Sequence, residues 1–258
     1  MINAVGRELP EKIGNYIVKP YAGAKETIDA EKTVASRRKP SKRAVNGTKL
    51  MPDLKEAIKK TGLRDGMTIS FHHCFREGDY IIGLVLSAIK ELGIKGLRFA
   101  PSAVVNIKNP SIVDFVKDGT INRIQASGIR GELGDAVVEG LELAEPVILR
   151  PHGARPHTIE TGDLSIDVAF IGASAADDFG NCTGQVGPNA CGSLGYSFID
   201  ATCAENVVVI TDNLVPYPCV PISISQMYVD YVVKVDQIGD SAKIGAGAPA
   251  EQRIRVTF

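Results

Sequence analysis

The chain has 258 residues, 44% of them hydrophobic, so it can bury a sizeable core and fold as one compact domain. Its 29 basic and 30 acidic residues leave a formal net charge of -1, which excludes a global field that would attract nucleic acid or an anionic membrane. Neither a secretory signal nor a run of ~20 apolar residues that could span a membrane is found, so we expect a cytoplasmic protein.

Residues 1–50 are polar and are expected to form an extended arm ahead of the folded domain. Basic residues cluster in one part of this arm, namely Arg37, Arg38, Lys39, Lys42 and Arg43. Such a cluster could touch a nucleotide phosphate, although a solvated or partner-docking segment is the more common case. We place the domain at residues 51–248 and a short tail at residues 249–258.

From residue 51 the sequence alternates between helix and strand signals. Residues 54–63 are expected to form a short amphipathic helix that Gly62 stops, and residues 67–71 a buried strand. A helix over residues 80–92 follows, with Asp79 as its amino-terminal cap. Further strands are expected at residues 96–99, 121–126, 146–149, 166–171, 207–211 and 231–235, with a helix at 112–116.

Several of these strands are continuous apolar runs, which is typical of strands that are covered on both faces. We therefore expect an open, mostly parallel α/β sheet flanked by helices. The helix over residues 80–92 is apolar on nearly every face, so we expect that it also meets another domain or subunit.

Ligands of open α/β sheets sit outside the carboxyl ends of the strands, so the loops that leave those ends are the first candidates for a site. Four loops qualify, at residues 72–79, 126–134, 150–157 and 172–187. In the last of them, Asp177, Gly180 and Asn181 are expected to form a tight structural turn. The glycines that follow lack the spacing of a phosphate loop, so a dinucleotide site is not supported.

The first loop carries two adjacent histidines, His72 and His73, between a buried strand and a helix. Backbone amides at the helix start, together with one histidine, could stabilise a thioester oxygen that gains negative charge during acyl transfer. Neighbouring side chains on extended chain point opposite ways, so at most one histidine easily faces a ligand, and a structural role is equally open. Arg76 in the same loop is a candidate for substrate binding.

Cys74 stands beside His73 and could act as a nucleophile. A small buried cysteine is the commoner case, and no orienting Asn or Asp accompanies the pair. The five cysteines of the chain form no CxxC pair, so neither a disulfide scaffold nor a structural zinc site is expected.

The second loop offers two small residues, Ser127 and Gly128, for close approach of a ligand to the backbone, and Arg130 as a cation. The third loop holds two arginines and two histidines within eight residues, and Arg155 is its main candidate. Guanidinium groups bind carboxylates through two charged hydrogen bonds, which suits a polycarboxylate or a phosphate. Pairing of each arginine with an acid of the protein itself is equally open.

The chain matches a known family in four segments, namely FHHCFREGD, the preceding KKTGLRDGMTIS, ARPHTIETGDLSIDVAFIGASAADDFGNCTG and VVKVDQIGDSAKIGAGA. In order and spacing they resemble the amino-terminal half of citrate lyase alpha chains, in which the third position of the first loop is usually histidine and here is Cys74. The strand followed by AADDFGN is similar to the amino-terminal domain of family I CoA-transferases, which have an open α/β fold.

The resemblance implies acyl exchange between an acetylated acyl carrier protein and citrate, giving citryl-acyl carrier protein and acetate. The thioester would belong to CoA or to the CoA-like prosthetic group of the acyl carrier (gamma) subunit, and a separate beta subunit would cleave the citryl product. We therefore expect an oligomeric complex and no covalently bound cofactor. Under this hypothesis His72 and His73 stabilise the thioester oxygen, while Arg130 and Arg155 hold citrate carboxylates.

In that family a glutamate attacks the acyl thioester, and this glutamate usually belongs to a second domain. The tail at residues 249–258 departs from the family pattern, so we expect the glutamate to come from outside this chain. One alternative is a non-catalytic module that docks the carrier or the lyase subunit. A phosphosugar isomerase has a related layout, but the sequence shows no carboxylate base beside a phosphate-binding loop.

Overall fold

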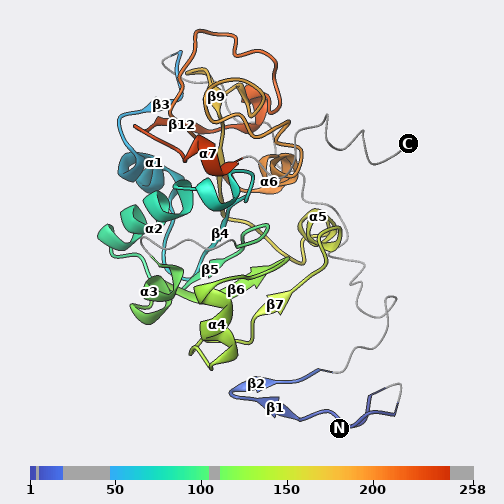
Figure 1. Ribbon diagram of the computed structural model, residues 1–258. Helices are drawn as coiled ribbons and strands as arrows, with labels where there is room; N and C mark the ends of the chain where they lie inside the picture. The colour runs from blue at the N-terminus through green and yellow to red at the C-terminus, as the bar shows by residue number, and fades with distance from the viewer. Residues whose placement is uncertain (4–5, 20–46, 105–110, 245–258) are drawn as a thin grey trace, which may run out of the picture.

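The computed structural model describes residues 1–3, 6–19, 47–104 and 111–244 (Figure 1). The basic cluster of the arm and the tail at residues 249–258 lie outside these ranges. The strands are β1 (Lys12–Ile13), β2 (Tyr16–Ile17), β3 (Leu50–Met51), β4 (Thr68–Ser70), β5 (Leu97–Phe99), β6 (Ile121–Ala126), β7 (Ile148–Leu149), β8 (Val168–Gly172), β9 (Ala175–Ala176), β10 (Cys182–Thr183), β11 (Asn206–Thr211) and β12 (Tyr231–Lys234). The α-helices are α1 (Leu54–Thr61), α2 (Ile81–Glu91), α3 (Ile112–Lys117), α4 (Glu132–Val138), α5 (Ala154–Glu160), α6 (Ser197–Cys203) and α7 (Ser241–Ile244).

An eight-stranded sheet forms the centre of the fold, in the order β3-β12-β11-β8-β4-β5-β6-β7. Every neighbouring pair in this sheet is parallel. The open α/β sheet expected from the apolar strands is thus confirmed. Its edge strand β3 begins at Leu50, at the end of the segment expected to be an arm.

Alternate residues of the central strands point into two hydrophobic cores on opposite faces of the sheet. Along β8, Val168 and Phe170 belong to one core, while Ala169 and Ile171 belong to the other. Helices α1 to α4 cover the first core, and α5 and α6 cover the second (Figure 1). Burial of each large apolar side chain contributes about 1.5–3 kcal/mol, so the central strands are firmly anchored on both faces.

The ends of α1 and α2 follow the expected capping signals. Asp53 accepts a hydrogen bond from the backbone of Glu56, and Gly62 ends α1 in the left-handed region with φ of 70°. Before α2, Oδ1 of Asp79 accepts a hydrogen bond from the backbone N–H of Ile82 at 3.0 Å. The loop from β4 therefore meets a fixed helix start.

Most of the apolar surface of α2 is covered within the chain. The helix packs against α1, α3 and the sheet, and seven of its residues are buried. Tyr80 and Leu84 remain 41% and 39% exposed, so the expected contact with another domain is narrowed to one stripe of the helix.

Helices α4, α5 and α6 were not expected from the sequence. Each has only seven residues and starts without a side-chain cap, so the usual helix signals are missing. As a result Arg155, expected in a loop, lies in the first turn of α5.

The direction in which strands are added to the sheet reverses between β4 and β8. Strands β5, β6 and β7 follow β4 on one side, while β11 and β12 follow β8 on the other. Loops that leave two such strands diverge and open a crevice at the carboxyl edge, where ligands of α/β proteins bind. The loop that begins with His72 leaves β4 at this point.

Gly172 allows the loop after β4 to pack over the end of β8. A Cβ atom at this position would lie 2.2 Å from Cδ1 of Ile81 and 2.3 Å from Cε2 of Phe75. Both distances are far below a normal contact between carbon atoms, so only glycine fits here without displacing these side chains. The fully buried Phe75 thereby anchors the loop that carries the two histidines.

Candidate functional site

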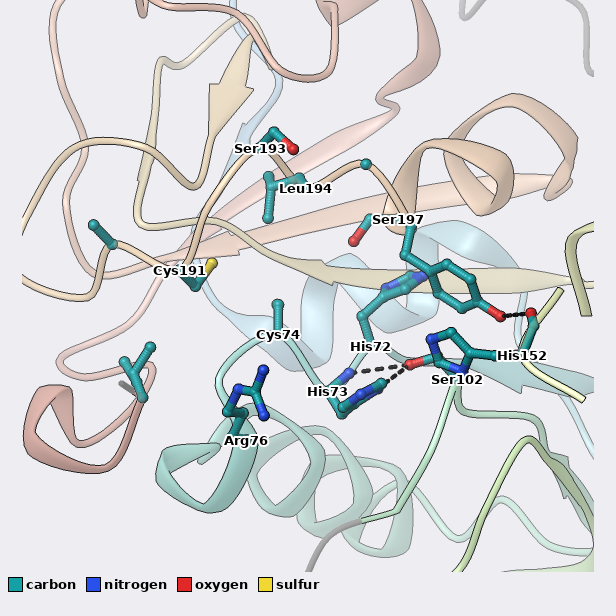
Figure 2. A pocket seen from close by; sticks show the side chains of 14 residues that line it. His72, His73, Cys74, Arg76, Ser102, His152, Cys191, Ser193, Leu194 and Ser197 are labelled. Carbon is teal, nitrogen blue, oxygen red and sulfur yellow. Dashed lines mark hydrogen bonds between the residues drawn. The ribbon is translucent and has the colours of Figure 1, made fainter. Parts of the chain in front are cut away.

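A pocket of about 490 Å³ lies at the carboxyl edge of the sheet, beside the crevice between β4 and β8. Its walls come from the loops after β4, β5 and β7 and from the segment that leads into α6 (Figure 2). The lining residues are His72, His73, Cys74, Arg76, Ser102, His152, Ala190, Cys191, Ser193, Leu194, Gly195, Tyr196, Ser197 and Ile244.

His73 is held by Ser102, which is fully buried and follows β5 (Figure 2). The hydroxyl oxygen lies 2.7 Å from Nδ1 of His73 and accepts a hydrogen bond from the backbone N–H of His73 at 3.2 Å. Among the described residues, Nδ1 of His73 is the acceptor within reach of the Ser102 hydroxyl proton. Nδ1 therefore accepts, and we assign the proton of the imidazole to Nε2.

His73 is neutral at neutral pH. Burial is the main cause, and the nearby charges of His152, Arg76, His72 and Arg130 add to it, so that the pKa of His73 falls from 6.5 to about 4. A neutral imidazole with its proton on Nε2 can donate a hydrogen bond from that atom without any change in protonation.

His152 and Tyr196 form an aromatic platform beside His73. Their rings stack at 4.4 Å between centroids with 9° between planes, and the ring of His152 meets that of His73 edge-on at 5.7 Å. The Tyr196 hydroxyl donates a hydrogen bond to the carbonyl oxygen of His152 at 2.5 Å. The loop after β7 is therefore tied to the start of α6.

A buried charged cluster lies beneath the pocket, centred on Asp200 of α6. Its Oδ2 atom lies 2.5 Å from Nε2 of His72 and 3.0 Å from Nη2 of Arg155, and it accepts a hydrogen bond from the Ser70 hydroxyl at 2.7 Å. Burial alone would raise the pKa of Asp200, but the charges and hydrogen bonds of Arg155 and His72 outweigh it and hold the pKa below its usual range. The carboxylate is thus charged at neutral pH.

The structure places Arg155 away from the direct contact with citrate that the sequence suggested. Arg155 is 2% exposed, does not line the pocket, and is paired with Asp200 on one side of its guanidinium group. The alternative that this arginine pairs with an acid of the protein fits the geometry. Its guanidinium also lies over the ring of Tyr196, 5.6 Å from the centroid.

Arg76, by contrast, lines the pocket and is exposed. Its backbone has a φ of 51°, and across the pocket Leu194 has a φ of 54°. Left-handed backbone costs a residue with a side chain about 1–2 kcal/mol. Among the described non-glycine residues, these two alone have positive φ, and strain of this kind is concentrated at functional sites.

The second loop lies next to the pocket but does not line it. The backbone N–H of Ser127 donates to the carbonyl oxygen of Ser102 at 3.0 Å, and the carbonyl of Gly128 accepts from Val104 at 2.9 Å. Arg130 is exposed, and its charge contributes to the lowered pKa of His73. The loops after β5 and β6 thus run side by side, with Arg130 at the rim.

Cys74 is not disposed to act as a nucleophile. A hydrogen bond with Cys191 and burial, in that order, raise the pKa of the Cys74 thiol well above its ordinary value. The thiolate is the reactive form, so this environment disfavours attack by Cys74.

Asp177 forms the structural turn that was expected in the fourth loop. Its Oδ1 atom accepts hydrogen bonds from the backbone N–H groups of Phe179, Gly180 and Asn181 at 2.9 to 3.0 Å. All of its carboxylate contacts lie within the protein, so this loop supports the fold.

Within the described ranges, no three His, Cys, Asp or Glu side chains lie close enough to hold a metal ion. Among the helices of the described residues, none combines the length and apolar character that a membrane span requires.

The fold class follows from solved structures that share this sheet. An acyl-CoA transferase from Escherichia coli in a thioester complex with CoA matches 82% of this chain and 53% of its own at a TM-score of 0.58 and 13% identity. Glutaconate coenzyme A-transferase from Acidaminococcus fermentans matches over 72% of this chain and 75% of its own length, at a TM-score of 0.52 and 14% identity. The chain therefore has the CoA-transferase fold.

Within this class, residues 47–254 match the citrate lyase alpha subunit family, and the chain belongs to it. The citrate lyase alpha chain of Escherichia coli is 48% identical over 200 residues, which are 78% of this chain and 39% of that one. The Haemophilus influenzae chain is 47% identical over 206 residues, covering 80% and 41%. The chain thus spans about two fifths of the length of these curated relatives.

A solved structure of the alpha subunit of citrate lyase from Streptococcus mutans, in complex with citrate, supports the same assignment. It is 44% identical to this chain and superposes with a TM-score of 0.80. The match covers 93% of this chain and 46% of that one.

Sequence reasoning missed three residues that shape the site: Ser102, Tyr196 and Asp200. None carries a motif; Ser102 follows β5, while Tyr196 and Asp200 come from the start and the middle of α6. The spacing of Tyr196 and Asp200, one helical turn apart, would have been informative had α6 been recognised.

Proposed function

We propose that this chain forms the amino-terminal part of a citrate lyase alpha subunit, which exchanges acetyl for citryl groups on the thioester of an acyl carrier protein. The observation that carries the proposal is the composition of the pocket. It presents the neutral donor His73 beside the cation Arg76, and none of the described residues that line it is Asp or Glu. Such a pocket suits a polyanion next to a thioester carbonyl.

His73 acts on the carbonyl oxygen of the thioester. When a carboxylate attacks the carbonyl carbon, the oxygen gains negative charge, and a donor already oriented toward it lowers the barrier. The Ser102 hydroxyl holds Nδ1, so Nε2–H is available for this hydrogen bond. Because His73 stays neutral, the donor is available across the neutral pH range.

Arg76 and Arg130 hold carboxylates of citrate. Arg76 lines the pocket, and Arg130 is exposed at its rim, near enough to influence the pKa of His73. The guanidinium of each can bind a carboxylate through two parallel hydrogen bonds. Ser127 and Gly128 lie next to the pocket and brace the loop that carries Ser102, and Arg155 acts from beneath through Asp200.

The attacking carboxylate comes from outside this pocket. In the proposed exchange, a glutamate of a second domain attacks the acetyl thioester and releases the carrier thiolate, leaving an anhydride. The thiolate then attacks the glutamyl carbonyl and releases acetate. A carboxylate of citrate then attacks the glutamyl thioester and releases the carrier thiolate, leaving a citryl-glutamyl anhydride. The thiolate attacks the citryl carbonyl of this anhydride, which gives citryl-carrier and frees the glutamate.

The partners of the proposed reaction are the acyl carrier (gamma) subunit with its CoA-like prosthetic group, the beta subunit and a second transferase domain. CoA itself is an alternative thioester donor. The assembly is proposed to be an oligomer in the cytoplasm.

Citrate-dependent release of acetate tests the proposal. The chain is mixed with the carboxyl-terminal half of a citrate lyase alpha chain, acetylated carrier and beta subunit, and acetate is measured with and without citrate. We expect release only when this chain is present, and about 10- to 100-fold less with Arg76→Gln, which removes one charged contact. Release that is independent of this chain would refute the proposal.

A docking module without catalysis is the second candidate. A cavity of about 690 Å³ between α1, α2 and the end of β12 is lined by the exposed residues Tyr80 and Leu84. If docking alone mattered, Leu84→Asp would abolish assembly and His73→Gln would leave acetate release at the wild-type rate. A loss of release with His73→Gln in an intact assembly would exclude this candidate.

A further inference from the structure

Asp200 joins three elements that are far apart in the sequence. From α6 its carboxylate reaches Ser70 at the end of β4, His72 in the following loop and Arg155 on α5. It is fully buried. Buried ion pairs are often no more stabilising than apolar side chains of similar size, so stability alone is a poor explanation for this cluster.

We propose that Asp200 is a positioning residue for the acyl-exchange site: it fixes the ring of His72 and, through Arg155, the wall that Tyr196 forms. The inference rests on the proposed function, because it concerns the same pocket. Asp200 is not a catalytic residue, since it does not line the pocket.

The contact with Asp200 decides which nitrogen of His72 carries a proton. Nε2 of His72 lies 2.5 Å from the carboxylate oxygen. Two lone pairs at this separation would repel each other, so Nε2 carries the proton, although the contact with Asp200 is an ion pair and not an aligned hydrogen bond. The carboxylate thereby sets both the orientation of the ring and the position of this proton.

The other ring nitrogen of His72 is left for a ligand. Neither ring nitrogen has a hydrogen-bond partner among the described residues, but Nε2 has the ion-pair contact with Asp200, whereas Nδ1 is buried with no contact of this kind in a residue that lines the pocket. A buried polar atom without a partner is rare in proteins and calls for an explanation such as water or a ligand. A polar group of citrate or of the thioester in the pocket would supply that partner.

Asp200 is also linked to Tyr196, another residue that lines the pocket. Tyr196 precedes it by four residues, one turn of α6, so both lie on the same side of the helix start. Arg155, held by Asp200, lies over the ring of Tyr196. One buried carboxylate thus orients two residues that line the pocket.

A double-mutant cycle on the 258-residue chain tests the proposal through His72. Citrate binding is measured by calorimetry for the wild type, Asp200→Asn, His72→Gln and the double variant. We expect Asp200→Asn to weaken binding about 10- to 100-fold in the wild type and much less in the His72→Gln background. Equal weakening in both backgrounds is the result of a merely structural role and would overturn the proposal.

Nitrogen-15 spectra of the His72 ring supply a readout that does not depend on citrate. We expect a protonated Nε2 in the wild type and loss of this fixed state in Asp200→Asn. An unchanged His72 spectrum in the folded variant would overturn the positioning role. If the wild type binds no citrate, the proposed function fails, and the spectra still decide the role of Asp200.

Two further variants complete the test, one as a control and one as a replacement for Asp200→Asn. Asp118→Asn removes a carboxylate that pairs with Lys90 at the surface, far from this cluster, and should leave citrate binding unchanged. If Asp200→Asn does not fold, Ser70→Ala replaces it, because it deletes one hydrogen bond to the same carboxylate oxygen. Binding and spectra identical to wild type in Ser70→Ala would then contradict the proposal.

Discussion

His72 and His73 are neighbours in the chain but belong to two differently built regions. His72 is part of a buried floor in which charges of opposite sign compensate one another around Asp200. His73 belongs to a half-buried wall in which a neutral imidazole is held by the hydroxyl of Ser102. The comparison shows that two adjacent histidines acquire different electrostatic environments, one beside a buried carboxylate and the other beside a neutral hydroxyl.

The largest expected effect is on the floor. Arg155→Ala leaves Asp200 buried without its main cation, so the free energy of unfolding should fall by about 3–5 kcal/mol. Denaturant unfolding followed by circular dichroism measures it. Arg130→Ala, at an exposed position, is the matched control and should leave stability near that of the wild type. Similar stability of both variants would mean that the floor is not a compensated charge cluster.

Gly172→Ala should disturb the floor and the wall together. The added methyl group meets Phe75 and Ile81, whose packing supports the loop that carries both histidines. Overpacking of this kind costs about 1–3 kcal/mol of unfolding free energy. Gly128→Ala, where a Cβ atom meets nothing within 4 Å, is the control for thermal unfolding. An equal loss in the control would contradict the packing argument.

Ser102→Ala should affect the wall alone. It removes the hydrogen bond that fixes Nδ1 of His73 and should cost about 0.5–1.5 kcal/mol of stability. Nitrogen-15 spectra should show loss of the single His73 tautomer and no change in His72. A simultaneous change in His72 would show that the two regions are not separate.

The smallest expected effects concern the pH dependence of stability, which should separate the floor from the wall. The pKa of His73 is lowered from 6.5 to about 4, so the unfolded chain binds more protons in this window and stability is lost as pH falls through it. The pKa of Asp200 is lowered from 3.8, so its contribution is present above that value and is lost below it.

Differences between variants isolate these contributions from those of other groups. The stability difference between wild type and His73→Gln should shrink as pH falls from 6.5 to about 4. The stability difference between wild type and Asp200→Asn should shrink only below about pH 3.8. Solvent around the half-buried His73 screens its effect, so urea titrations at closely spaced pH values are needed. Shrinkage of both differences in one window would contradict the assignment.

The sequence predicts the fold well because strand signals are local. The apolar runs at β8, β11 and β12 are long enough to be recognised without knowledge of their neighbours, and the parallel sheet follows from them. The order of the strands is not local, so the switch point between β4 and β8 could not be placed from sequence.

The site is only partly predictable for the same reason. The loop with His72, His73 and Arg76 is contiguous and directly follows a strand, so it could be nominated. Asp200 stands 45 residues from Arg155 and 130 from Ser70, and only the folded chain brings these groups together. The sequence therefore shows which residues can bind and react, whereas their electrostatic environment depends on long-range contacts.

Acetate release by the assembled complex with a histidine variant tests the central claim most directly. His73→Gln should lower citrate-dependent release about 10²–10³-fold, the usual effect of removing one donor to the reacting oxygen. His157→Gln, at an exposed position of α5, should release acetate at the wild-type rate. Wild-type release by His73→Gln in an intact complex would contradict the assignment of this pocket to acyl exchange.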